Sequence, residues 1–590
     1  MKKICLLFTI NFSAICAIAQ SVGINNTTPH GSAILDVKSN TKGMLMPRTS
    51  TTSRLAITNP AIGLILYDTT ASAFYFYNGS SWAMLTERAN VWGLTGNTNT
   101  NPSINFVGTT DNQPLRFRIN NINAGLIDSI LNNTSIGFRT LDSVTTGFSN
   151  TAIGYKALMS NVNGNSNTAT GFNALRFNKS GSGNTANGGY ALFLNTDGNI
   201  NTANGFAALY SNTTGSNNSA SGCYALYNNS IGNFNSASGV SSLQTNITGS
   251  NNTASGAKSL FSNTSGSFNT ADGANALGTN TTGSNNTAIG ETALFSNTSG
   301  VENTASGFQS LFANNIGEGN TGNGYKALFS NSTGVRNTGI GFRTLYSNST
   351  GQSNTALGEL TMADNTIGEF NTAIGSFALS SNLTGNQNTA VGVSALQYLK
   401  NGTKNIAIGN NSGNAFGSPN VTNTISIGND DILNGANNQV IMGNFSSTGY
   451  YSNNPWATFS DARIKTNIKE DVQGLDFIMR LKPVTYFKSI KQMVTITANK
   501  ETADFPGKYD VEKIKFSGFL AQEVEQSAKE TGYDFSGIHK PNNSNELYAL
   551  SYETFVVPLV KAMQEQQVII MNQQKQIDLL EKRLAALEVR

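Results

Sequence analysis

Ser460 and Lys465 form the pair whose types and spacing could do covalent chemistry in this chain. They lie five places apart in the segment Ser-Asp-Ala-Arg-Ile-Lys. A serine hydroxyl attacks a carbonyl only when a neighbouring base takes its proton, and a neutral lysine can be that base. Lowering a lysine pKa from about 10.4 to about 7 costs about 4–5 kcal/mol, so a tightly packed site is required. The alternative is that Ser460 and Asp461 cap a helix, with Arg463 and Lys465 on its solvated face.

Residues for other kinds of site are scarce. Histidine occurs only at His30 and His539, which excludes a multi-histidine metal site, and we expect no metal and no cofactor. The net charge of +3, from 37 basic and 34 acidic residues, is spread thinly. It gives no reason to expect nucleic acid or an acidic membrane surface as a partner.

The elements that would position Ser460 and Lys465 belong to a C-terminal part of distinct composition. From Phe459 onward the chain becomes charged and helix-prone. Its last segment carries apolar or amide residues at alternate spacings of four and three, at Leu559, Met563, Gln566, Ile570, Gln573, Ile577, Leu580, Leu584 and Leu587. This seam predicts a coiled coil of about four heptads, in which the two glutamines fix register and oligomer state.

Four motifs occur in order in this C-terminal part: Ser460-Asp-Ala-Arg-Ile-Lys-Thr-Asn-Ile468, Leu481-Lys-Pro-Val-Thr-Tyr-Phe487, Phe516-Ser-Gly-Phe-Leu-Ala-Gln-Glu-Val-Glu525 and Leu550-Ser-Tyr-Glu-Thr-Phe555. Together they resemble the intramolecular chaperone domain of endosialidase-type phage tailspikes and tail fibres, over about 456–590. The resemblance implies a trimerising chaperone and a serine-type autopeptidase without an external substrate. Ser460 would attack the preceding carbonyl, with Lys465 as its partner, and the Phe459–Ser460 bond would break. Some members have the fold without cleavage, so a retained clamp stays open as an alternative.

The middle of the chain is a repeat of 17 residues. Asn-Thr-Ala-x-Gly recurs from Asn133 to Asn405 in 17 units without an insertion. The fifth place is always glycine, the ninth is leucine in 15 units, and a second glycine falls at the fifteenth place. Such a unit cannot bury a core alone, so the pattern predicts one coil of a β-solenoid per unit. The residue after Asn-Thr and the leucine should point inward, and asparagine and threonine should form ladders.

The coil pattern changes its spacing near the end of the repeat. The segments Asn423–Gly428 and Asn438–Gly443 keep the strand motif and are expected to be capping coils. The whole pattern resembles the heads of trimeric autotransporter adhesins over about 133–444. That resemblance implies a left-handed parallel β-roll assembled as a trimer, and a disordered Asn/Ser/Thr-rich linker is the alternative.

The repeat offers little for a glycan hydrolase, which needs paired carboxylates. Residues 133–413 hold nine acidic side chains, none paired at the same place of a neighbouring unit: Asp142, Asp197, Asp272, Glu291, Glu302, Glu318, Glu359, Asp364 and Glu369. A flat Asn/Thr ladder that binds ice or a crystal lattice is a further alternative. A calcium-binding roll is disfavoured because it needs repeated aspartates.

A small β module is expected before the repeat. Gly63–Asp68 and Phe74–Trp82 are predicted as two strands, with a turn at Asn78-Gly79. The aromatic group Phe74, Tyr75, Phe76, Tyr77 and Trp82 would be a packed or trimer-facing strand, or alternatively a platform for sugar stacking. Segments beginning Val22-Gly-Ile-Asn-Asn and ending Tyr-Asn-Gly-Ser-Ser-Trp are similar to the starts of exported fibre-like proteins of Bacteroidetes.

The first residues are predicted to be an export signal. A positive start is followed by a short apolar stretch and by Ala17-Ile18-Ala19, a small-x-small cleavage site. Cys5 and Cys16 would leave with it, so that Cys223 alone remains and no intrachain disulfide forms. We expect a secreted or cell-surface protein without a transmembrane segment after signal removal.

The predicted organisation is mainly β, with a C-terminal α+β domain. It comprises a signal peptide (1–19), a small β module (20–85), a β connector (86–132), the solenoid rod (133–444), the chaperone domain (445–558) and a trimeric coiled coil (559–590). The predicted function is an exported trimeric fibre or adhesin-like protein, whose partners are its own copies and a surface glycan or host-cell receptor. The alternative is a tailspike-like fibre that binds or degrades glycans.

Overall fold

The computed structural model describes residues 21–85, 96–98, 100–413, 420–428, 436–450, 458–497, 506–541 and 543–589. The predicted signal peptide lies outside them. The chain divides into two compact units, Met1–Gly108 and Thr109–Arg590. Among the described residues, no helix combines the length and apolar character needed to cross a bilayer.

The first unit contains two small sheets. β1 (Val22–Ile24) pairs in parallel with β2 (Leu35–Val37). The second sheet has the order β3-β4-β5-β6, with β3 (Arg48–Thr49), β4 (Ile65–Asp68), β5 (Ala73–Tyr77) and β6 (Trp82–Met84). The two expected strands are therefore three, because the chain reverses at Asn78, whose amide oxygen accepts from the backbone N–H of Ser80 and Ser81.

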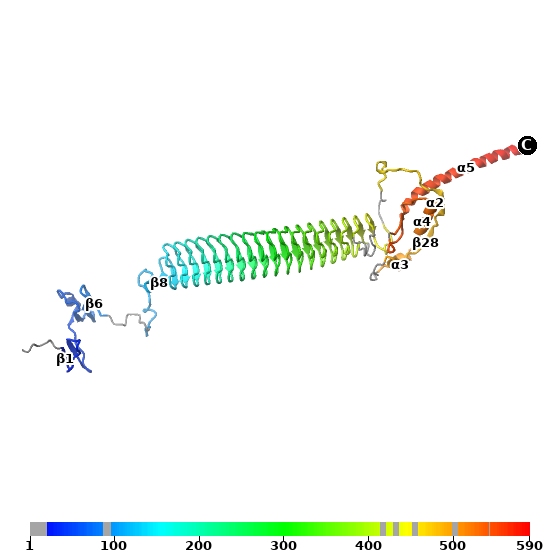
Figure 1. Cartoon of the computed structure of the whole chain (residues 1–590). Coiled ribbons are helices and arrows are strands. Elements are labelled where there is room, and N and C mark those ends of the chain that lie inside the picture. The colour runs from blue at the N-terminus through cyan, green and yellow to red at the C-terminus, as the bar shows by residue number, and fades with distance from the viewer. Residues whose placement is uncertain are drawn as a thin grey trace, which may run out of the picture. The chain divides into compact units, whose positions relative to one another are not determined.

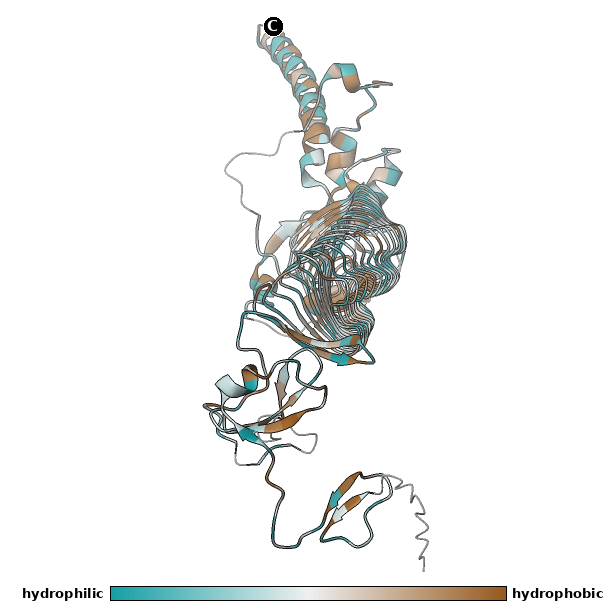
Figure 2. Cartoon of the chain, turned by 90° about the vertical axis from the view of Figure 1, so that its left-hand side faces the viewer, coloured by the Kyte–Doolittle hydropathy of each residue, from teal (hydrophilic) through white to brown (hydrophobic). Residues whose placement is uncertain are grey.

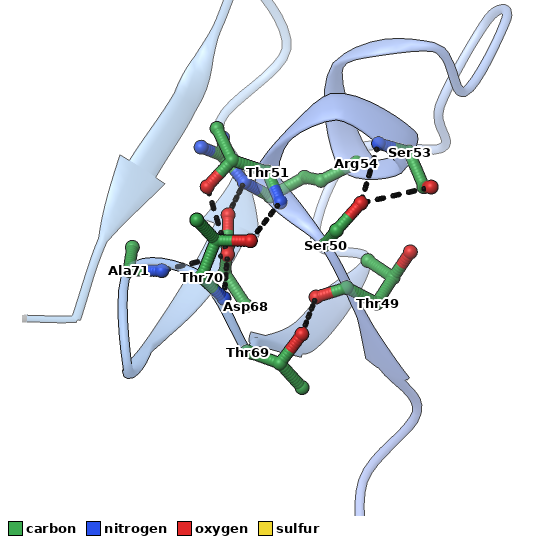
Figure 3. A network of polar contacts seen from close by, with 9 residues as sticks. All are labelled: Thr49, Ser50, Thr51, Ser53, Arg54, Asp68, Thr69, Thr70 and Ala71. Atoms are coloured by element: carbon green, nitrogen blue, oxygen red, sulfur yellow. Dashed lines mark hydrogen bonds and ion pairs between the residues drawn. The ribbon is translucent and has the colours of Figure 1, made fainter.

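A buried ion pair holds this second sheet to the short helix α1 (Thr51–Leu55). The Arg54 Nε donates to Asp68 Oδ2 at 2.8 Å, and both side chains are buried. Figure 3 shows that the Thr51 hydroxyl and the amides of Thr70 and Ala71 also converge on the Asp68 carboxylate. Burial opposes ionisation of Asp68, but these hydrogen bonds outweigh it and lower its pKa from 3.8 to about 2.

The second unit begins with an antiparallel cap. β7 (Leu115–Ile119) pairs with β8 (Ile122–Asp128), and β8 pairs with β9 (Asn133–Ile136), the first strand of the solenoid. The turn between β7 and β8 consists of Asn120 and Asn121, both with positive φ, as a tight hairpin requires. An antiparallel cap covers backbone groups that an open parallel stack would expose.

The solenoid consists of one short strand per coil, and the coils stack in parallel (Figure 1). Seen from the end of the rod, successive coils lie behind one another (Figure 2). The strands after β9 are β10 Thr151–Ile153, β11 Thr168–Thr170, β12 Thr185–Asn187, β13 Thr202–Asn204, β14 Ser219–Ser221, β15 Ser236–Ser238, β16 Thr253–Ser255, β17 Thr270–Asp272, β18 Thr287–Ile289, β19 Thr304–Ser306, β20 Thr321–Asn323, β21 Thr338–Ile340, β22 Thr355–Leu357, β23 Thr372–Ile374, β24 Thr389–Val391, β25 Ile406–Ile408, β26 Ile425–Ile427 and β27 Val440–Met442. The mainly β solenoid of 17-residue coils is thus confirmed.

The core of each coil is small and regular. Ala152 at the third place and Leu158 at the ninth are fully buried, as are their counterparts along the stack. Asparagines at the first and twelfth places are buried too, and they bond from coil to coil. Asn150 Nδ2 donates to Asn133 Oδ1 at 3.1 Å and to the Gly164 carbonyl at 2.9 Å. Because nearly all of these buried amide groups are hydrogen-bonded, with Asn382 Oδ1 at the end of the ladder an exception, a polar core costs little.

The two glycines of a coil have different reasons to be glycine. Gly290, at the fifth place, has a φ of 126°, and a Cβ there would lie 2.7 Å from the Gly307 carbonyl oxygen. Gly283, at the fifteenth place, needs no positive φ, but a Cβ would lie 2.5 Å from the Gly300 carbonyl oxygen. The coil also places non-glycine residues in the left-handed region, such as Lys156, Leu158 and Ser166.

The last coils adapt to a changed spacing. β26 follows β25 by 19 residues, since Ile406 pairs with Ile425, and β27 follows β26 by 15, since Ile425 pairs with Val440. The strands stay in parallel register, so the extra or missing residues fall outside the strands.

The C-terminal part is a small α+β fold. Its elements are η2 Ala462–Ile464, α2 Leu475–Arg480, β28 Val484–Tyr486, α3 Ile490–Ile496, η3 Asp510–Lys513, β29 Phe516–Gly518, α4 Ala521–Glu530, β30 Ile538–His539, β31 Ala549–Leu550, η4 Tyr552–Phe555 and α5 Val556–Glu588. β28 pairs with β29 and β30 with β31, both antiparallel. The core consists of Phe477, Val524, Ala528, Phe535 and Phe555.

The long helix α5 has 33 residues and packs on α2 near its start, where Pro558 and Ala562 are buried. Beyond that contact the helix is exposed. The seam residues Ile570, Ile577 and Leu584 are 48%, 47% and 61% exposed in the single chain. The apolar seam therefore has no partner within the described part of its own chain.

Candidate functional site

The Ser460 and Lys465 side chains meet across a short turn. Asp461 begins η2, and its Oδ1 accepts from the backbone N–H of Arg463 at 2.9 Å. The turn ends at Lys465, whose backbone N–H donates to the Ala462 carbonyl. Lys465 Nζ then lies 2.8 Å from Ser460 Oγ and donates a hydrogen bond to it. A spacing of five residues over one tight turn thus brings the nucleophile and base candidates into contact.

Asp461 and Arg463 form a salt bridge. Arg463 Nε lies 3.0 Å from Asp461 Oδ2, and the cap bond adds a second contact. The Arg463 side chain, and then its backbone amide, hold the pKa of Asp461 below its usual range. Asp461 in turn raises the pKa of Arg463. Of the capping alternative, Asp461 does cap the turn, and Arg463 and Lys465 are exposed, whereas the Ser460 hydroxyl contacts Lys465 instead.

The site is open in the single chain. Ser460 and Lys465 are exposed, and the Phe459 side chain is 94% exposed. Only a neutral amine can act as a base, and burial is what favours the neutral form of a lysine. One chain therefore supplies the contact between the two side chains but not the burial.

Comparison with known protein families finds two matches, one before the solenoid and one after it. Residues 460–533 match the family described as chaperone of endosialidase. The match begins at Ser460 itself. Residues 23–103 match the family described as phage tail like trimerisation region. No curated protein and no solved structure matches the chain.

The chain therefore carries a phage tail-like trimerisation region and a C-terminal endosialidase-type chaperone domain, with the solenoid between them. The trimerisation region implies a homotrimer. The matched chaperone segment contains α2 and α4, which supply Phe477, Val524 and Ala528 to the small core.

A charged cluster stabilises the chaperone domain next to that core. Glu525 on α4 accepts from Lys529 Nζ and Lys540 Nζ, both at 2.9 Å, and from the Tyr548 hydroxyl at 3.0 Å. These hydrogen bonds lower the pKa of Glu525 from 4.5 to about 2. The cluster ties α4 to the segment around β30 and β31, and sequence reasoning did not find it.

The solenoid carries aromatic rows that the sequence analysis also missed, although a ring at every seventeenth residue was the available signal. At the tenth place, Phe295, Phe312, Phe329 and Tyr346 stack at 5.1–5.5 Å with planes within 10° of parallel. Each ring face is thereby covered by the next ring. Such a row strengthens coil stacking, and its inner rings Phe312 and Phe329 have a neighbouring ring on both faces.

The aromatic group of the trimerisation region is also engaged within the chain. The Arg54 guanidinium lies 3.8 Å from the centre of the Tyr75 ring, and Tyr77 meets Trp82 edge to face at 5.7 Å. These contacts support the packed strand over the sugar-stacking platform.

Proposed function

We propose that the chain is an exported trimeric fibre, in which the β-solenoid is the shaft and the C-terminal domain is a chaperone that releases itself after assembly. The observation that carries the proposal is the 2.8 Å contact between Ser460 Oγ and Lys465 Nζ at the first residue of the matched chaperone segment. Export and a location at or beyond the cell surface rest on the N-terminal signal pattern.

The proposed reaction is an acyl shift followed by hydrolysis. Ser460 Oγ attacks the carbonyl carbon of Phe459, while Lys465 Nζ takes the hydroxyl proton. The C–N bond to Ser460 breaks, the Ser460 nitrogen receives that proton from Lys465, and an ester joins Phe459 to Oγ. Water then hydrolyses the ester, which frees the Phe459 carboxylate and the Ser460 amine and hydroxyl.

Assembly would switch this reaction on. Because the pair is exposed in one chain, packing of three chaperone domains is what we propose to desolvate Lys465. Cleavage would then follow correct trimerisation, and misassembled chains would stay intact. The α5 seam supports this order, since a coiled coil can bring three chains together before the non-local pairings of a long β-solenoid form.

The solenoid is proposed to be structural or adhesive rather than hydrolytic. Its aromatic faces are stacked on one another, and its acidic residues are sparse. A glycan or a host receptor remains the class of target that a surface fibre would contact.

Native mass spectrometry of the full-length product, combined with a denaturing gel of the same sample, tests the proposal. We expect three solenoid chains per particle and a separate C-terminal fragment. A monomeric particle would contradict the fibre assembly, and a trimer of intact chains would contradict the release step alone.

A further inference from the structure

The outward-facing residue at the fourth place of each unit changes character along the solenoid. From β11 to β17 it is polar in every coil, from Thr170 to Asp272. From β21 to β26 it is aliphatic in every coil. We call the fourth-place residues of β21 to β26 the apolar stripe: Ile340, Leu357, Ile374, Val391, Ile408 and Ile427.

The apolar stripe is a continuous surface. Parallel register pairs Ile340 with Leu357 and Leu357 with Ile374, so the side chains form one row. Ile340, Leu357 and Ile374 nevertheless remain 37%, 44% and 39% exposed in the single chain. A contiguous exposed apolar row of this length marks an interaction surface.

The strand face around the stripe is free of charge. The second place of the same strands is threonine from β21 to β24 and isoleucine in β25 and β26. The next places around the coil differ, since Arg343 stands at the seventh place in the coil of β21 and Glu359 at the sixth in the coil of β22. Of the places compared, only the second and fourth, which form the strand face, are uncharged in every coil from β21 to β26.

The occupant that fits this surface is a second and third copy of the chain. The trimerisation region implies three copies, and three parallel chains in register bring the same residue of each copy to the same height on one axis. A surface at the axis must be compatible with itself. An aliphatic row meets this condition, whereas Arg343 would be set against the same positive charge of the other copies.

We propose that the apolar stripe lies on the threefold axis of the trimer, where Ile374 of each copy contacts Ile374 of the other two. The copies pack through β21–β26, and the polar fourth-place residues of β11–β17 stay hydrated. This inference rests on the proposed homotrimer.

Disulfide trapping in the full-length trimer tests the inference. In a chain with Cys5, Cys16 and Cys223 replaced by serine, Ile374→Cys should link copies on mild oxidation. Two of the three chains can pair, so a dimer band with residual monomer is expected on a non-reducing gel. Ser255→Cys, at the fourth place of β16, and Thr384→Cys, on another face of the same coil as Ile374, are the matched controls. Linking at 374 should exceed both by roughly tenfold, because proximity raises the effective concentration.

A second variant avoids the reliance on oxidation. Ile374→Asp should fold, because Asp272 already occupies the same place in β17. It should lower the midpoint of thermal dissociation of the trimer, while Ser255→Asp should leave the midpoint unchanged.

The outcomes separate the two proposals. A trimer by sedimentation with no excess linking at 374, or with equal effects of the two aspartate variants, overturns the axial stripe and leaves the trimer standing. A monomer by sedimentation overturns both. A glycan or lipid that covers the stripe in place of another copy would give one of these two outcomes, because Ile374→Cys would then not link the copies preferentially.

Discussion

Asn178 Nδ2 donates to Asn161 Oδ1 of the preceding coil at 2.8 Å, and it also donates to the Gly181 carbonyl of its own coil at 2.8 Å. The same two bonds recur along the twelfth place to Asn382. A single asparagine thus closes its own coil and joins it to the coil before, which explains why a fully buried amide is retained beside the alanine and leucine of the core.

Asn280→Ala should therefore destabilise the middle of the solenoid. The change removes the bonds to Asn263 and Gly283 and deprives Asn297 Nδ2 of one of its two acceptors. Leaving buried polar groups unpaired should cost about 2–4 kcal/mol of local stability. Hydrogen exchange of the backbone amides in the coils around residue 280 measures this loss of local stability. Thr282→Ala, at an exposed position of the same coil, should change exchange little, and equal protection in both variants would contradict the role of the ladder.

Gly290→Ala should destabilise its coil by about 2–4 kcal/mol, because it combines a positive φ with a backbone contact that a Cβ cannot satisfy. Gly189→Ala is the matched control, since a Cβ at that glycine meets nothing closer than 3.5 Å. Thermal unfolding followed by far-ultraviolet circular dichroism compares the two. A Gly290→Ala protein as stable as Gly189→Ala would show that the corner tolerates a side chain.

Glu525 should make the chaperone domain sensitive to acid. Its folded pKa of about 2 lies below the ordinary 4.5, so its contribution is present above about pH 4.5 and is lost as the pH falls toward 2. Glu525→Gln should be less stable at neutral pH and should lose less stability over that interval. Pepsin digestion at a series of acidic pH values measures the unfolded fraction. Glu581→Gln, on the exposed end of α5, should follow the wild type.

The α5 seam should hold the copies together. Ile570→Lys combined with Ile577→Lys places charges in the predicted interface and should convert the trimer to monomers or to misassembled chains. Asn572→Lys lies off the seam and should leave the trimer intact. Sedimentation velocity distinguishes these species. A trimer that survives the double substitution would show that other elements suffice for assembly.

Much of the solenoid could be predicted, because one coil determines all others. The inward alanine and leucine and the invariant fifth-place glycine follow from a strict period of 17. The left-handed backbone at Leu158 or Ile200 could not be predicted, since an isolated leucine or isoleucine avoids it and only the stacked neighbours impose it. The buried pair of Arg54 and Asp68 could not be predicted either, since helix α1 and strand β4 bring the two residues together across 14 positions.

At the candidate site, the sequence predicted the two residues and the structure adds how they meet. The spacing of five is bridged by a single turn, and the acidic residue of the motif, Asp461, caps that turn. The desolvation that we propose for Lys465 would come from packing between copies, which a single chain does not contain.

The measurement that tests the central claim most directly is the intact mass of the purified protein over time, for the wild type, Ser460→Ala and Lys465→Ala. The wild type should yield a fragment of residues 460–590 that begins at Ser460. Ser460→Ala should slow release by a factor on the order of 10⁴ or more, and Lys465→Ala by roughly 10²–10⁴, with all three proteins trimeric by sedimentation. A wild-type trimer that stays full-length, or a Ser460→Ala trimer that yields the same fragment, would contradict self-release by this pair.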